Sequence, residues 1–109
     1  MLKRAKRRYL AIEVDSIEAF DSRELMETIW TAIEKLYGEY GASQTGLSLI
    51  RYNADRKQVI IRVMCDAVDM LRTAVATITR INGKPAALHV QMVSGTLKAL
   101  QRKTGGIAS

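Results

Sequence analysis

The chemistry-bearing residues of this 109-residue chain are mainly cationic, and the densest group lies at its start. The first eight residues hold five bases and no acid: Lys3, Arg4, Lys6, Arg7 and Arg8. Each cation that pairs with a phosphate releases condensed counterions, so this cluster favours nucleic-acid binding that weakens as salt rises. Basic arms also serve as solubilising or nuclear-import tails. Because this arm runs directly into an alternating apolar segment that carries Tyr9, we interpret it as an anchored nucleic-acid contact.

A second candidate anion site lies where a predicted strand gives way to a predicted helix. It consists of Ser94, Gly95, Thr96, Leu97 and Lys98. Small residues at such a junction expose backbone N–H groups, and Ser or Thr can cap the helix, so a phosphate could bind there with Lys98 adding charge. A plain helix cap is the simpler interpretation. Arg102 and Lys103 would extend a phosphate track along the same helix.

Residue types that support catalysis are scarce. The single histidine, His89, has no second histidine and no recognisable nucleophile, and the single cysteine, Cys65, cannot form an internal disulfide. The chain has no Walker loop and no glycine-rich dinucleotide turn. It also lacks the glycine-rich loop after the first strand that an acylphosphatase would need. We therefore expect no catalytic residue, no metal site and no cofactor.

The charge of the whole chain is segregated. The net charge is +6, yet residues 9–39 hold eight acids and two bases, whereas residues 40–109 hold ten bases and three acids. This pattern predicts a polyanion on one surface and an acidic helix turned elsewhere, although a solvated basic exterior would look similar.

The length predicts one domain spanning residues 1–109, with residues 1–6 as a basic arm and residues 104–109 as a flexible tail. No apolar run approaches the roughly 20 residues that cross a bilayer. The apolar stretch after the basic start is too short for a signal peptide. We expect a cytoplasmic protein with no membrane contact.

Periodicity places these residues on seven elements, four strands and three helices. Alternating residues predict strands at 7–14, 46–53, 57–65 and 86–93. A capping box at Asp21 and Glu24 opens a helix that should stop at Gly38 and Gly41. A second box at Asp66 and Asp69 should open a helix that stops at Asn82-Gly83, and residues 97–103 should form a short terminal helix.

The element order predicts an α+β domain of the ferredoxin-like or RNA-recognition-motif-like class. This class has a split βαββαβ antiparallel sheet with two helices on one face, and the short C-terminal helix is an addition to it. Right-handed crossovers would place the first and third strands at the centre of the sheet.

The face of the sheet away from the two long helices is predicted to be too apolar for solvent alone. Leu49 and Met92 are expected to face the two helices. The residues expected on the other face are Tyr9, Ile50, Tyr52, Ile60, Arg62, Met64, His89 and Gln91. From these, Ile50, Tyr52, Ile60 and Met64 are predicted to contact a protein partner. The alternative is that the terminal helix folds over this face. Base stacking is weakly supported, because Tyr9 is the only aromatic residue on the two central strands.

Five short motifs together resemble one family. They are Arg7-Arg8-Tyr9-Leu10, residues 37–42 (YGEYGA), Leu49-Ile50-Arg51-Tyr52, residues 59–63 (VIIRV) and residues 94–98 (SGTLK). In this order and spacing they resemble the ribonuclease P protein component 2 family, in its archaeal version, and the resemblance covers nearly the whole chain.

The resemblance implies a non-catalytic subunit of an RNA enzyme that removes the 5′ leader from precursor tRNA, with catalysis by the RNA and its magnesium ions. It implies contact with ribonuclease P RNA and precursor tRNA, and pairing with the TIM-barrel subunit, protein component 3. A homodimer contact giving a heterotetramer is a further expectation. By matching motif positions, RNA contact is expected at Arg7, Arg8, Tyr9, Arg51, Arg62, Thr96 and Lys98.

Two other functions compete with this one. A ferredoxin-like dimerisation module would use the apolar sheet face and ignore RNA. An acylphosphatase-like hydrolase would turn over acyl phosphates and depend on Arg7 or Arg8.

Overall fold

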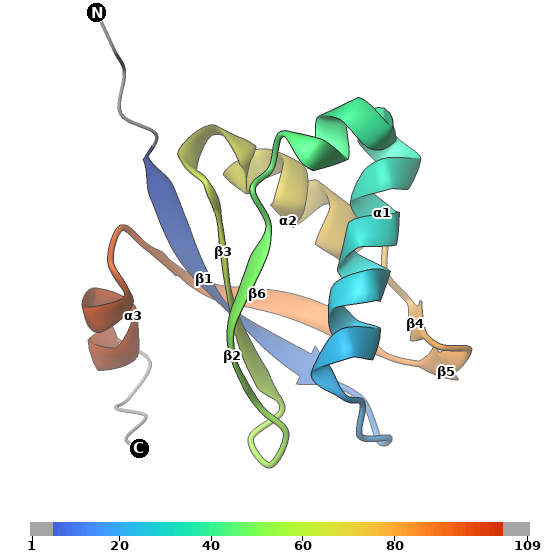
Figure 1. Ribbon diagram of the computed structural model, residues 1–109. Helices are drawn as coiled ribbons and strands as arrows, with labels where there is room; N and C mark the ends of the chain where they lie inside the picture. The colour runs from blue at the N-terminus through green and yellow to red at the C-terminus, as the bar shows by residue number, and fades with distance from the viewer. Residues whose placement is uncertain (1–5, 104–109) are drawn as a thin grey trace, which may run out of the picture.

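The computed structural model describes residues 6–103 and has four main strands and three α-helices in that range (Figure 1). In chain order the elements are β1 (Arg7–Asp15), α1 (Ser22–Ser43), β2 (Ser48–Asn53), β3 (Gln58–Met64), the 3₁₀ turn η1 (Cys65–Ala67), α2 (Val68–Ala76), β4 (Arg80–Ile81), β5 (Lys84–Pro85), β6 (Ala87–Ser94) and α3 (Leu97–Lys103).

The main sheet is antiparallel with the strand order β2-β3-β1-β6. The predicted split βαββαβ fold is therefore confirmed, including the central position of the first and third predicted strands, which are β1 and β3. Helices α1 and α2 lie on one face of this sheet, and α3 lies on the opposite face (Figure 1). No helix within residues 6–103 is both long enough and apolar enough to cross a membrane.

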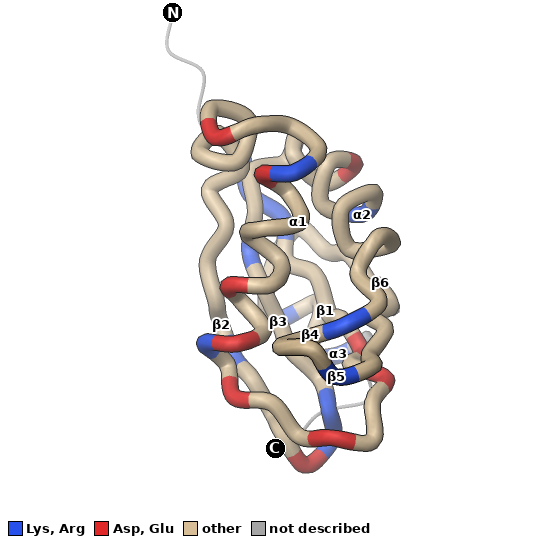
Figure 2. The backbone as a smooth tube through the Cα atoms, turned by 90° about the vertical axis from the view of Figure 1, so that its right-hand side faces the viewer, with Lys and Arg blue, Asp and Glu red and all other residues tan. Residues whose placement is uncertain are grey.

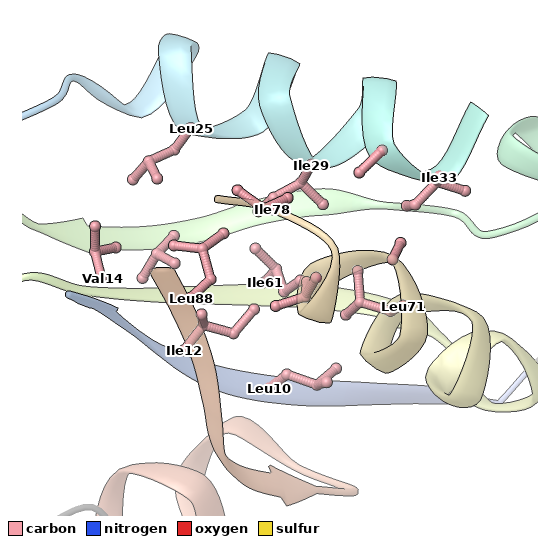
Figure 3. Close-up of a cluster of buried hydrophobic side chains, with 14 of the residues drawn as sticks. Leu10, Ile12, Val14, Leu25, Ile29, Ile33, Ile61, Leu71, Ile78 and Leu88 are labelled. Carbon is pink, nitrogen blue, oxygen red and sulfur yellow. The ribbon is translucent and has the colours of Figure 1, made fainter. Parts of the chain in front are cut away.

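The large core lies between the sheet and the helices α1 and α2 (Figure 3). Alternate residues of β1, Leu10, Ile12 and Val14, point into it and meet Leu25 of α1 and Leu71 of α2. All five are at most 2% exposed. Burying side chains of this size contributes about 1.5–3 kcal/mol each before the entropy cost of ordering them, so this layer supplies most of the stability.

A second, smaller apolar cluster lies beneath α3. Ala11 of β1, Ile60 of β3 and Leu100 of α3 are at most 2% exposed and contact one another. Four partly buried side chains complete it: Tyr9, Ile50, Met92 and Leu97. The alternative interpretation, in which the terminal helix covers the second sheet face, is the one that the structure supports.

Helix α1 begins as predicted but ends differently. Asp21 accepts from the backbone N–H of Glu24 at 2.8 Å, and the Glu24 side chain accepts from the Asp21 N–H at 3.1 Å. Gly38 has a left-handed φ of 77°, which breaks the helix, but residues 39–43 then resume helical geometry. The predicted stop at Gly38 is thus a kink, and Gly41 lies inside the resumed turn.

Two predictions for the second helical segment are wrong. Ala67 occupies the N-cap of α2 without a side-chain hydrogen bond, so Asp66 and Asp69 form no capping box, because the turn η1 precedes the helix. The helix also ends at Ala76, and Asn82-Gly83 forms the turn of the small β4–β5 hairpin. Both turn residues have positive φ, 55° and 82°, as a two-residue type I′ hairpin requires.

Register shifts in the two edge strands reverse the predicted orientation of several side chains. The β2–β3 pairing shifts between Leu49 and Arg51, and the β1–β6 pairing shifts between Ala11 and Ile12. An extra residue in one strand moves every later side chain to the other face. As a result, Tyr52 packs against the large core and Met92 joins the small cluster beneath α3. Leu49 precedes the shift and is 39% exposed on the edge strand β2.

Candidate nucleic-acid interface

The first basic strand and the turn into α3 lie next to each other, although they are more than 80 residues apart in the chain. Strand pairing places Tyr9 opposite Ser94. A Cβ added at Gly95 would stand 3.7 Å from Nη1 of Arg8, so the Arg8 guanidinium lies against this turn. The structure thus brings the Arg7-Arg8 and 94–98 motifs to the same edge of the fold.

Arg62 lies on the central strand β3, directly opposite Tyr9 of β1. Its side chain is half-buried, and its Nε atom is buried without a hydrogen-bond partner in the described part of the chain. An unpaired buried N–H costs about 1–3 kcal/mol, and an acceptor that approached this guanidinium would recover part of that cost.

Arg51 connects β2 to the terminal helix. With the side-chain amide of Gln101 oriented so that its oxygen faces β2, that oxygen accepts from Nη1 of Arg51 at 3.0 Å and from Nη2 at 3.2 Å. Arg51 is otherwise exposed. It therefore fixes the position of α3 on the sheet and adds positive charge beside it.

The junction at residues 94–98 is mainly a helix cap. Oγ1 of Thr96 accepts from the N–H of Ala99 at 3.1 Å, which makes Thr96 the cap of α3. Ser94 is only 7% exposed, and its Oγ accepts from the N–H of Thr96 at 3.4 Å, so its hydroxyl is less available to a ligand than predicted. Lys98 and Arg102 are exposed on the helix.

The remaining cations predicted to contact RNA lie at the two ends of the described chain or beyond them. Lys6 is exposed, and its carbonyl accepts from the N–H of Cys65 at 2.7 Å, which ties the beginning of the chain to the end of β3. Lys103 is the last residue of α3. Lys3, Arg4 and the side chain of Lys103 lie outside the described residues.

Charge changes sign along β1. Arg7 and Arg8 lie at its start, whereas Glu13 and Asp15 lie at its end, where Oδ2 of Asp15 is 3.8 Å from Nε2 of His89. Figure 2 views the molecule from the right-hand side of Figure 1, the side of α1, and shows acidic residues along this helix. We define the α3 face as Arg7, Arg8, Arg51, Arg62, Lys98 and Arg102. These six cations come from four different elements, whereas α1 contains four acids and two bases.

The four predicted partner residues do not share one open face. Ile60 is buried under α3 and Ile50 packs beside it, whereas Tyr52 and Met64 pack against the large core. Tyr52 also donates from its hydroxyl to the carbonyl of Phe20 at 2.5 Å. The prediction of one open apolar face is therefore wrong, because α3 covers it and the shift in β2 turns Tyr52 toward the helices.

Side chains that commonly bind metals or act as nucleophiles do not cluster in the described part of the chain. No group of three or more His, Cys, Asp and Glu within residues 6–103 could hold a metal ion. His89 is exposed and its neighbour is Asp15, and Cys65 is half-buried at the end of β3. What the arrangement offers chemically is a group of cationic side chains.

Sequence reasoning missed the role of Gln101, whose contact with Arg51 orients the terminal helix. Its only signal was its position on a short basic helix. The hairpin at Asn82-Gly83 was also missed, and there the Asn-Gly dipeptide itself is a known type I′ turn signal.

Fold and site together define a small α+β protein with a basic face. The family model described as the Rpp14/Pop5 family matches residues 8–104, and the chain belongs to that family. Ribonuclease P protein component 2 of Pyrococcus horikoshii is 35% identical over 100 residues, covering 92% of this chain and 83% of the relative. The protein of the same name from Methanosarcina mazei is 34% identical, covering 92% and 84%.

A solved structure agrees with the fold. One chain in the cryo-EM structure of yeast ribonuclease MRP superposes with a TM-score of 0.66 at 16% identity, covering 95% of each chain. The family resemblance inferred from the five motifs is confirmed by these comparisons.

Proposed function

We propose that this chain is a non-catalytic protein subunit of ribonuclease P that supports the catalytic RNA during removal of the 5′ leader from precursor tRNA. The observation that carries the proposal is the convergence of Arg7 and Arg8 with the turn into α3, in a chain whose relatives are named ribonuclease P protein component 2. A surface on which several cations gather suits a folded RNA backbone.

The RNA contact is assigned to the α3 face together with Lys3, Arg4, Lys6, Tyr9, Ser94, Gly95, Thr96 and Lys103. Small residues at the turn leave room for a phosphate to approach, and Tyr9, half-buried beneath α3, contributes packing more than stacking. Contacts to the phosphate backbone position a protein without reading sequence, so recognition would depend on RNA shape.

In this proposal hydrolysis belongs to the RNA and its magnesium ions. The protein works in the cytoplasm and pairs with protein component 3, the TIM-barrel subunit, with a homodimer contact producing a heterotetramer.

Reconstitution tests the proposal. The cognate RNA is assayed for precursor-tRNA cleavage with protein component 3 alone and then with this chain added. We expect a higher cleavage rate, or activity at lower magnesium, only when both proteins are present. An unchanged rate contradicts the proposed function.

A further inference from the structure

The turn of the β4–β5 hairpin carries a dipeptide whose chemistry the proposed function does not use. Asn82 and Gly83 are both exposed and form the two central positions of this turn. The side-chain amide of an asparagine can react with the backbone nitrogen of the next residue, and glycine there has no side chain to hinder the approach. A Cβ added at Gly83 would meet nothing within 4 Å, so the surrounding protein leaves this approach open.

Asn82 also ties the hairpin to the start of α1. Its Nδ2 donates to Oε2 of Glu24, while Oε1 of the same carboxylate accepts from the N–H of Asp21 at 3.1 Å. Both oxygens of Glu24 are therefore engaged, one in the capping box of α1 and one with the hairpin. Ile81 is fully buried in the large core, so Asn82 is presented to α1 from an anchored turn.

We propose that Asn82-Gly83 is a site of spontaneous covalent modification, deamidation through a cyclic imide, which turns this tie into a repulsion. The backbone nitrogen of Gly83 attacks Cγ of Asn82 and forms a new C–N bond. The Cγ–Nδ2 bond breaks, and the amide leaves as ammonia with the proton that the Gly83 nitrogen gives up. Water then opens the ring at either carbonyl, which leaves aspartate at this position or isoaspartate, in which the backbone runs through Cβ.

Either product removes the donor from which Glu24 accepts. The new carboxylate lies beside the carboxylate of Glu24, in the first turn of a helix whose N-cap is a further acid, Asp21. Like charges at such short range repel each other, most strongly at low salt. We therefore expect the modification to separate the hairpin from α1.

The isoaspartate product also changes the geometry of the turn. It adds one backbone atom to a two-residue loop that places Ile81 opposite Lys84. A type I′ turn requires positive φ at both loop residues, and Asn82 and Gly83 meet this with φ of 55° and 82°. A longer loop no longer fits this pairing. Nη1 of Arg80, which donates to the Gly83 carbonyl at 3.2 Å, then loses its acceptor.

The chain supplies its own comparison site. Asn53 is the other asparagine of the sequence, is exposed like Asn82, and is followed by Ala54. The methyl group of Ala54 hinders ring closure. Oδ1 of Asn53 also accepts from the N–H of Arg56 at 3.1 Å, which holds its side chain in the β2–β3 turn. Asn53 should therefore react more slowly than Asn82.

The first experiment incubates the folded, full-length chain in mildly alkaline buffer and follows both asparagines by peptide mapping. Electron-transfer fragmentation in the mass spectrometer separates aspartate from isoaspartate. We expect Asn82 to react about tenfold faster than Asn53, which corresponds to a barrier lower by about 1.4 kcal/mol. Equal rates at the two sites, or an unmodified Asn82, overturn the proposal.

The second experiment tests the repulsion with Asn82→Asp, which makes the aspartate product directly. Hydrogen exchange in residues 80–85 should accelerate about tenfold, from the lost hydrogen bond and the added repulsion together, and less at high salt. Adding Glu24→Gln to this variant should slow the exchange again, because it removes one of the two facing charges.

Asn53→Asp is the matched control, since it makes the same charge change on the β2–β3 turn and should leave exchange in residues 80–85 unchanged. Unchanged exchange in Asn82→Asp, or an equal acceleration in Asn53→Asp, overturns the proposal. Both experiments use this chain alone, so their outcome is independent of the proposed function.

Discussion

The side of the sheet under α1 and α2 differs from the side under α3 in both buried apolar surface and charge. The first holds most of the buried residues and carries an acidic helix, whereas the second has three buried residues and several cations near them. Like charges gathered on one surface repel one another and oppose folding. The large core can offset that cost, which leaves the α3 side free to concentrate positive charge for a polyanion.

The largest effect is expected from Leu71→Ala in the large core. Leu71 is fully buried among side chains that cannot easily collapse around a cavity, so the free energy of unfolding should fall by about 2–5 kcal/mol. Urea denaturation followed by circular dichroism measures the change. RNA affinity per folded molecule should stay the same. An equal loss of RNA affinity would show that the two sides are coupled.

Leu100→Ala in the small cluster is expected to cost less, about 1–3 kcal/mol, because α3 can separate from the sheet without global unfolding. Hydrogen exchange should accelerate in residues 97–103 first and leave α1 unchanged. If α1 exchanges faster by the same factor, α3 is part of the global folding unit and the two sides of the sheet are not independent.

Removing one cation from each end of the α3 face tests its charge. The double variant Arg7→Ala/Arg102→Ala should bind ribonuclease P RNA roughly tenfold more weakly, and the slope of log affinity against log salt should fall by about 2. Arg72→Ala on α2 is the control, since it removes an exposed cation from the other side of the sheet. An equal effect of Arg72→Ala would indicate non-specific binding to overall charge.

The smallest effect is expected from Tyr52→Phe, which removes the hydrogen bond to the Phe20 carbonyl and should cost about 1 kcal/mol. Burial raises the pKa of Tyr52 above its ordinary value of 10.0, with the hydrogen bond to Phe20 acting in the opposite direction. The folded state therefore holds this proton more tightly than the unfolded state. The contribution of Tyr52 to stability should be constant below pH 10 and fall as the pH rises above it.

Comparing the pH dependence of urea midpoints for Tyr52→Phe and wild type checks this sign. The variant should lose part of the decrease seen above pH 10. A steeper decrease in the variant would contradict the assignment.

The two-layer fold could be predicted from the sequence because the alternation of apolar residues and the helix-start signals indicate the same elements. Leu10, Ile12 and Val14 alternate on β1, and the capping box at Asp21 marks the start of α1. The family followed from five ordered motifs. In contrast, the orientation of Tyr52 and Met92 depends on register shifts set by the neighbouring strands, which a single-sequence pattern does not contain.

The candidate site was predictable by residue type but not by arrangement. That Arg7, Arg8 and residues 94–98 carry charge is visible in the sequence, whereas their adjacency depends on β6 pairing with β1. The capping box predicted at Asp66 and Asp69 failed for a local reason. Two acidic residues at this spacing cap a helix only where the α-helix begins directly after the first of them, and here the 3₁₀ turn η1 comes first.

The position of α3 also has a consequence for how the chain folds during its synthesis. The strand that pairs with β1 along one side, β6, and the helix that covers Ala11 and Ile60 are the last two elements of the described chain. A ribosome must therefore release nearly all of the described chain before this apolar surface is shielded. Until then a nascent polypeptide exposes Ala11 and Ile60, which makes early contact with a chaperone or with RNA advantageous.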